Sequence, residues 1–198
     1  MKRPGTDPRR LLAIGMGANL RAPRLGSPAS TLAWAGERLG RLLAEVAVAP
    51  LYRSAPISHL AQPDFWNTVA LAALPGPDDE LGSPRRLLGA LKALENEAGR
   101  GPAERDAPRV LDLDLLFFGD LQLAEEALPA PAEPGRWPGP LTLPHPRLRE
   151  RLFVLAPLRD LAPDLALPPD GRTVAELYAA LAGSQRIERA GASAEPIL

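Results

Sequence analysis

Two carboxylates stand one residue apart in an otherwise apolar segment, Arg109–Phe118. Side chains alternate between the two faces of a β-strand, so Asp112 and Asp114 would share one face with Leu116 and Phe118. Two like charges on an apolar strand repel each other and lose hydration, so a compensating positive group is expected. Mg²⁺ is one candidate, because it binds one or two carboxylates and completes its shell with water and phosphates. The alternative is a solvated sheet face on which the aspartates pair with arginine.

Cationic side chains flank this segment on both sides. They are Arg100, Arg109, His145, Arg147, Arg149 and Arg151. Carboxylates that bind Mg²⁺, surrounded by arginines that bind phosphate, are typical of phosphoryl transfer, and a pair of metal ions would neutralise both sides of the displacement. The sequence contains no Walker A motif, no G-x-G-x-x-G after a strand and no G-x-S-x-G. Nucleotide binding would therefore use neither of the common glycine-rich loops.

The composition excludes several other classes of protein. The chain has 198 residues, no cysteine and two histidines, which excludes a disulfide framework, a Cys nucleophile and a His-rich zinc site. The net charge of −1 gives no overall attraction to nucleic acid or to a membrane surface. No apolar segment approaches the roughly 18 residues of a membrane span, and none resembles a signal peptide. We expect a cytoplasmic monomer that acts on small molecules.

The apolar pattern predicts an alternating order of strands and helices. Strands are expected over residues 11–16, 46–51, 65–74, 110–118, 121–123 and 141–143, and helices over 28–43, 83–99, 151–161 and 173–181. The first six long elements follow the order β-α-β-β-α-β, which predicts an α+β fold of the ferredoxin-like, split βαβ type. We expect the helices on one face of a mostly antiparallel sheet and the ligands on the other face or at loop ends.

The remaining segments complete the predicted domain organisation. Residues 1–10 form an N-terminal extension, residues 11–183 form one domain, and residues 184–198 form a loose tail. Within the domain, residues 54–64 and 100–108 are predicted loops, and residues 124–140 form a proline-rich insertion.

Six segments carry the motifs of one enzyme family in chain order. They are Gly17-Ala18-Asn19-Leu20, Leu51–Pro56, Gln62–Asn67, Glu95 with Gly99-Arg100, Pro108–Leu116, and Pro144-His145 with Arg151–Leu158. On these residues the chain resembles the 6-hydroxymethyl-7,8-dihydropterin pyrophosphokinases of folate biosynthesis, over about residues 11–181. The resemblance implies transfer of the β,γ-pyrophosphoryl group of ATP to the pterin hydroxymethyl group, release of AMP, and two Mg²⁺ ions.

The resemblance also implies roles for individual residues. Asp112 and Asp114 would hold both metal ions, and Arg100 and Arg109 would bind the phosphates and act in catalysis. The nucleotide would further contact Glu95, Leu115, Thr142, His145 and Arg151. The pterin would be bound by Ser54, Ala55, Ile57, Phe65, Asn67 and Phe153. These residue types suit a flat heteroaromatic ring, which needs an aromatic platform and an amide that both donates and accepts hydrogen bonds.

The sequence departs from the family pattern in its expected lid. Residues 100–108 are one residue shorter than the family's loop and lack its tryptophan. Trp137 in the insertion is a candidate substitute for that tryptophan. Arg105 is a candidate for the family's further arginine. Pro146 replaces a common aromatic residue. We therefore keep two alternative hypotheses to the pyrophosphokinase: a catalytically silent domain that binds pterin or nucleotide, and a simple kinase that releases ADP.

Overall fold

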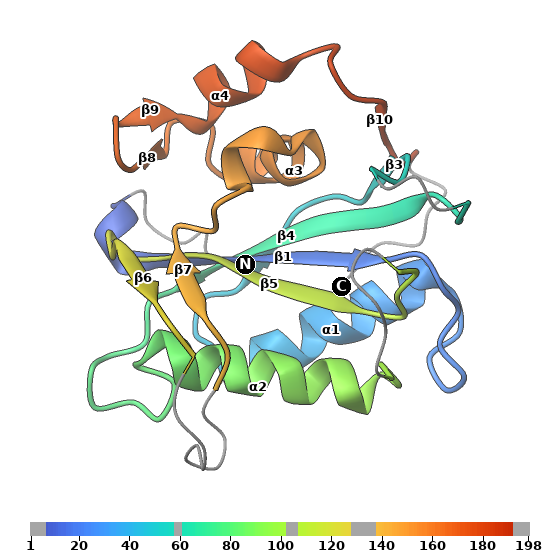
Figure 1. Ribbon diagram of the computed structural model, residues 1–198, viewed down its shortest axis with the longest axis horizontal. Helices are drawn as coiled ribbons and strands as arrows, with labels where there is room; N and C mark the ends of the chain where they lie inside the picture. The colour runs from blue at the N-terminus through green and yellow to red at the C-terminus, as the bar shows by residue number, and fades with distance from the viewer. Residues whose placement is uncertain (1–6, 58–60, 102–106, 128–137, 192–198) are drawn as a thin grey trace.

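The computed structural model describes residues 7–57, 61–101, 107–127 and 138–191. The central sheet has the strand order β10-β3-β4-β1-β5, with β2 also paired to β4, and all of its pairings are antiparallel (Figure 1). Its strands are β1 (Leu11–Ala18), β2 (Ala47–Val48), β3 (Tyr52–Ser54), β4 (Phe65–Ala73), β5 (Asp112–Phe118) and β10 (Ile187–Arg189). The order of the four main strands confirms the ferredoxin-like prediction.

Helices cover both faces of this sheet (Figure 1). Helices α1 (Pro28–Leu42) and α2 (Pro84–Glu97) pack on one face, and α3 (Leu152–Leu161) packs on the other with α4 (Val174–Leu181) against it. The expectation of helices on one face only is therefore wrong. Residues of β1 and β4 are buried on both faces, so each face needs a helical layer to remove it from water.

Local sequence signals start and end the two helices of the first layer. Ser27 and Ser83 cap α1 and α2, since each side chain accepts a hydrogen bond from the backbone N–H three residues later, and proline follows each cap. Gly99 has φ of 98° just after α2, a backbone conformation that favours glycine and ends the helix there.

A β-bulge divides β5 into two parts. Ile14 of β1 pairs with Leu115, but the preceding Ala13 pairs with Phe117, so Leu116 is the extra residue on β5. Beyond the bulge Phe118 joins the core under α1 and α2, whereas Phe117 joins the core under α3. The prediction that Phe118 shares the face of the two aspartates is therefore wrong, because strict alternation fails at the bulge.

Two predicted segments also differ from their expected structure. The second strand is split into β2 and β3 on either side of Pro50, which cannot donate to a ladder, and Ser54 lies in β3 and not in a loop. The tail beyond Ser184 is not loose throughout, since β10 pairs with β3. The N-terminal residues 1–6, Arg105, Trp137 and the last seven residues lie outside the described residues.

The described residues also contain two small hairpins and two 3-10 segments. Strand β6 (Leu123–Glu125) pairs with β7 (Leu141–Leu143) at the base of the insertion, and β8 (Ala166–Leu167) pairs with β9 (Arg172–Thr173). The short 3-10 segments η1 and η2 are Pro8–Arg10 and Leu148–Glu150. In the part of the chain that the structure describes, no helix has the length and apolar character needed to cross a bilayer.

Candidate active site

The two aspartates of β5 lie on the sheet face toward α3 and meet arginines. Asp112 Oδ1 lies 2.9 Å from Arg100 Nη1 and 2.6 Å from Arg109 Nη1. Asp114 Oδ2 lies 3.6 Å from Arg151 Nη1. Their side chains are 27% and 33% exposed, so water and ligands can reach both carboxylates. The structure thus brings together the predicted catalytic residues.

Positive charge keeps Asp112 ionised in this cluster. Burial raises the pKa of the Asp112 carboxyl, but Arg109, Lys92 and Arg100 together outweigh it, and the net shift is downward. Asp112 is therefore a carboxylate at neutral pH and offers hard oxygen donors to a cation.

Glu95 supports this cluster from beneath the strand. It is 2% exposed, and its Oε1 accepts hydrogen bonds from Lys92 Nζ at 2.6 Å and from the Leu113 backbone N–H at 2.7 Å. Its second oxygen pairs with Arg100. Burial raises the pKa of Glu95, and Lys92 and Arg100 act against that rise. Glu95 therefore fixes Arg100 relative to β5, and its predicted contact with a nucleotide stays a prediction.

Asn19 ties together the loops around the cluster, a role that the sequence did not indicate beyond its place in the Gly17–Leu20 motif. Its Oδ1 accepts a hydrogen bond from the Arg109 backbone N–H at 2.7 Å. Its Nδ2 donates to Gln62 Oε1 at 3.0 Å and to the Pro63 carbonyl at 3.1 Å. Asn19 thereby positions Arg109 and the segment that leads into β4.

His145 lies beside β5 at the end of β7. Its backbone N–H donates to the Leu116 carbonyl at 2.7 Å, and its Nδ1 accepts from the Arg147 backbone N–H at 3.2 Å. The proton of the neutral ring is thus assigned to Nε2. Burial lowers the pKa of His145, with Asp114 acting in the opposite direction. The neutral ring presents one N–H donor near the carboxylates.

The other residues predicted to bind nucleotide or phosphate lie in different surroundings from the two aspartates. Thr142 is exposed on β7, whereas Leu115 is 4% exposed and packs in the core under α1 and α2. Arg149 does not join the cluster, because its Nη1 bonds Asp170 at 2.9 Å on the β8–β9 side. Arg147 lies 3.9 Å from Glu150.

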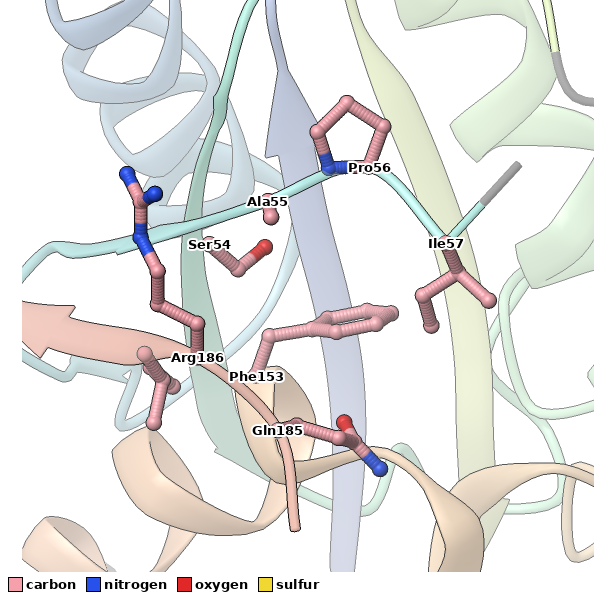
Figure 2. Close-up of a pocket in the computed structure, with 8 residues that line it drawn as sticks. Ser54, Ala55, Pro56, Ile57, Phe153, Gln185 and Arg186 are labelled. Carbon is pink, nitrogen blue, oxygen red and sulfur yellow. The ribbon is translucent and has the colours of Figure 1, made fainter. Parts of the chain in front are cut away.

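A cavity of about 160 Å³ opens on the same sheet face (Figure 2). Four of the six predicted pterin residues line it: Ser54, Ala55, Ile57 and Phe153. Asn67, 4% exposed, donates from Nδ2 to Ser54 Oγ at 3.0 Å, and Phe65 is the ladder partner of Ser54. The remaining lining residues, Pro56, Gln185, Arg186 and Ile187, were not predicted.

Arg151 and Gly17 connect the cavity to the carboxylate cluster. The Arg151 guanidinium carbon lies 5.5 Å from the centre of the Phe153 ring, while Nη1 of the same side chain faces Asp114. Gly17 pairs with Asn67 on β4 and with Asp112 on β5, so it forms the sheet surface between the two. Without a side chain at Gly17, a ligand in the cavity can extend toward Asp112.

The donor set fits a hard divalent cation. Among the described ranges, no group of three or more His, Asp or Glu side chains gathers as a metal site. The two aspartates stay the predicted metal ligands. Mg²⁺ commonly binds one or two carboxylates and retains waters and phosphate oxygens, which matches this pair. Arg100 and Arg109 both form ion pairs with Asp112. The same guanidinium groups can bind phosphate oxygens in place of the carboxylate.

Comparison with known proteins shows which family the chain resembles over most of its length. The family model "7,8-dihydro-6-hydroxymethylpterin-pyrophosphokinase (HPPK)" matches residues 13–163. A Pseudomonas aeruginosa protein named 2-amino-4-hydroxy-6-hydroxymethyldihydropteridine pyrophosphokinase is 44% identical over 167 residues, which cover 84% of this chain and 89% of that protein. A Methylorubrum extorquens protein of the same name is 35% identical over 179 residues, covering 88% and 97%.

Solved structures share the fold. The Plasmodium falciparum HPPK-DHPS A437G structure with SDX-DHP superposes with a TM-score of 0.66 at 14% identity, covering 86% of this chain and 45% of that chain. This chain therefore spans less than half of that larger protein. The residues matched by the family model include most of β1, the strand of Asp112 and Asp114, His145 and Phe153. The chain belongs to the 7,8-dihydro-6-hydroxymethylpterin-pyrophosphokinase family.

Proposed function

We propose that this protein transfers the β,γ-pyrophosphoryl group of ATP to the hydroxymethyl oxygen of 6-hydroxymethyl-7,8-dihydropterin and releases AMP. One observation carries the proposal: a carboxylate–arginine cluster and an aromatic cavity lie on one sheet face, joined by Arg151. The reaction needs such a pair of adjacent sites, because the oxygen of one substrate must reach a phosphorus atom of the other.

Asp112 and Asp114 would hold Mg²⁺, and two ions are proposed. When bound, Mg²⁺ neutralises charge on the phosphate oxygens and so favours the displacement. Arg100 and Arg109 would then turn from Asp112 to the transferred group and stabilise the charge that develops on its oxygens. His145 would donate from Nε2 to the nucleotide, as its neutral ring allows.

The pterin would lie in the cavity against Phe153. Ala55 and Ile57 supply apolar walls, and Ser54 and Asn67 supply polar groups for the ring edge. The hydroxymethyl group would point across Gly17 toward Asp112. Its oxygen would release its proton to water and bond to Pβ of ATP, while the bond between Pβ and the oxygen attached to Pα breaks and AMP leaves.

Product identity tests the proposal. Purified protein is mixed with 6-hydroxymethyl-7,8-dihydropterin, ATP and Mg²⁺, and the nucleotides are separated by chromatography. AMP that appears only with pterin present supports pyrophosphoryl transfer, and the Asp112→Asn variant serves as the control for contaminating enzymes. ADP would instead indicate a simple kinase. Binding of either substrate without any product would favour the silent binding domain.

We also infer a cytoplasmic monomer with no nucleic-acid or membrane partner. The net charge of −1 supports the absence of polyanion binding, and both substrates are small polar molecules. Light scattering at micromolar concentration tests the monomer, since a dimer would double the measured mass.

A further inference from the structure

The segment of residues 184–190, called here the C-terminal strap, forms one wall of the cavity (Figure 2). The family match ends at residue 163, so the strap lies outside it. The first anchor of the strap is β10, whose Ile187 pairs with Ser54 in the ladder with β3. The Ala190 backbone N–H extends that ladder by donating to the Leu51 carbonyl at 2.9 Å.

The second anchor of the strap is the side chain of Gln185 at the start of α3. Its Oε1 accepts a hydrogen bond from the Leu152 backbone N–H at 3.0 Å, and its Nε2 donates to the Glu150 carbonyl at 2.6 Å. The first N–H groups of a helix have no partner within the helix, and the N-cap residue Arg151 makes no side-chain cap bond. Gln185 therefore caps α3 from a distant part of the chain.

These two anchors connect the opposite walls of the cavity. Strand β3 carries Ser54 and leads into Ala55 on one side, and α3 carries Phe153, the residue after Leu152, on the other. The strap spans the two, so its length and its contacts fix the width of the space between them.

The exposed ion pairs of the strap contribute less to its position. Arg186 Nη2 lies 3.1 Å from Asp64 Oδ2, but the Arg186 side chain is 78% exposed. Ion pairs in water are weak, because solvent screens them and the long side chains lose entropy. The ladder to β3 and the amide of Gln185 are therefore the contacts that hold the strap.

We propose that Gln185 is a positioning residue for pterin binding, acting through Phe153. It caps α3, holds the Phe153 ring at a fixed separation from β3, and so determines the affinity of the cavity for a pterin-sized ring. This inference rests on the proposed function, and it adds a determinant that lies outside the matched family region.

The test compares Gln185→Ala with Glu188→Ala, an exposed residue of the same strap. Loss of a helix cap predicts that Gln185→Ala raises the pterin KM and the pterin Kd from calorimetry about fivefold. The ATP KM rises less than the pterin KM, because among the predicted ATP residues only Arg151 lies next to the residues that Gln185 bonds. Glu188→Ala leaves both KM values unchanged.

Repeating the substitution in the Phe153→Ala variant distinguishes a positioning role of Gln185 from general destabilisation of the protein. If Gln185 acts through Phe153, then Gln185→Ala adds no further rise in pterin KM to the Phe153→Ala variant. An unchanged pterin KM in Gln185→Ala, an equal rise in both substrates, or a full further rise in the Phe153→Ala background would each overturn the inference. Wild-type protein that binds pterin but forms no AMP would refute the proposed function alone, and the Kd values would still decide the role of Gln185.

Discussion

Replacing Gly17 with alanine tests whether the reacting groups meet over the centre of the sheet. Gly17 lies between Asn67 and Asp112 in the two ladders, on the face that carries both side chains. The methyl carbon of alanine would stand about 1.5 Å from the Cα atom, toward the substrates. A displacement of about 1 Å costs roughly a hundredfold in a reaction that depends on positioning. We therefore expect kcat to fall about a hundredfold, or ~2.7 kcal/mol in the barrier.

The fold should tolerate this change. A Cβ atom at Gly17 would meet nothing nearer than Asn67 Oδ1 at 3.4 Å, an ordinary contact. A glycine-to-alanine change also reduces the entropy of the unfolded chain, which stabilises the native state by about 0.4–1 kcal/mol where the backbone conformation is compatible. The free energy of unfolding should thus stay within about 1 kcal/mol of wild type, as measured by urea denaturation.

Gly15→Ala is the matched control in the same strand. Its Cβ would lie 3.3 Å from Leu116 Cδ2, so the new methyl group would be covered by Leu116 and not face a substrate. We expect a loss of about 1 kcal/mol in stability and a much smaller loss in kcat. AMP formation at saturating substrates measures both variants. If Gly17→Ala keeps kcat within threefold of Gly15→Ala, the path across Gly17 is wrong.

Three further predictions address the carboxylates, the pocket and the effect of pH. Asp112→Asn and Asp114→Asn should each lower kcat at least about a hundredfold with a near-native melting temperature, and wild-type activity in either would refute the metal assignment. Asn67→Ala should raise the pterin KM about tenfold, since it removes a buried hydrogen-bonding amide, and unchanged pterin affinity in calorimetry would contradict its placement. Burial, with the hydrogen bond from Tyr52 to Asp160, raises the pKa of Tyr52 to about 12. The unfolded chain ionises this phenol first, near pH 10, so the free energy of unfolding should decline between about pH 10 and pH 12, and Tyr52→Phe should lack that part of the decline in urea titrations.

Several features of the fold were predictable because their causes are local. Ser27-Pro28 and Ser83-Pro84 start helices, since the serine side chain satisfies a free backbone N–H within three residues. Strand β4 was predicted within one residue, because its apolar, β-branched and aromatic residues favour an extended, buried backbone. The paired aspartates and the motifs around them likewise indicated the candidate site residues from local sequence alone.

Other features depended on contacts between segments far apart in the chain. The bulge at Leu116 arises from pairing with β1. The second helical layer arises because α3 covers the other apolar face of the sheet. In the sequence Gln185 is an ordinary polar residue of a predicted tail, but in the structure its amide forms two hydrogen bonds at the start of α3. The sequence by itself determined which residues are predicted to do the chemistry, since side-chain type and spacing are local. Only the tertiary structure decided what surrounds them, because partners such as Gln185 and Leu152 are set by packing and not by their neighbours in sequence.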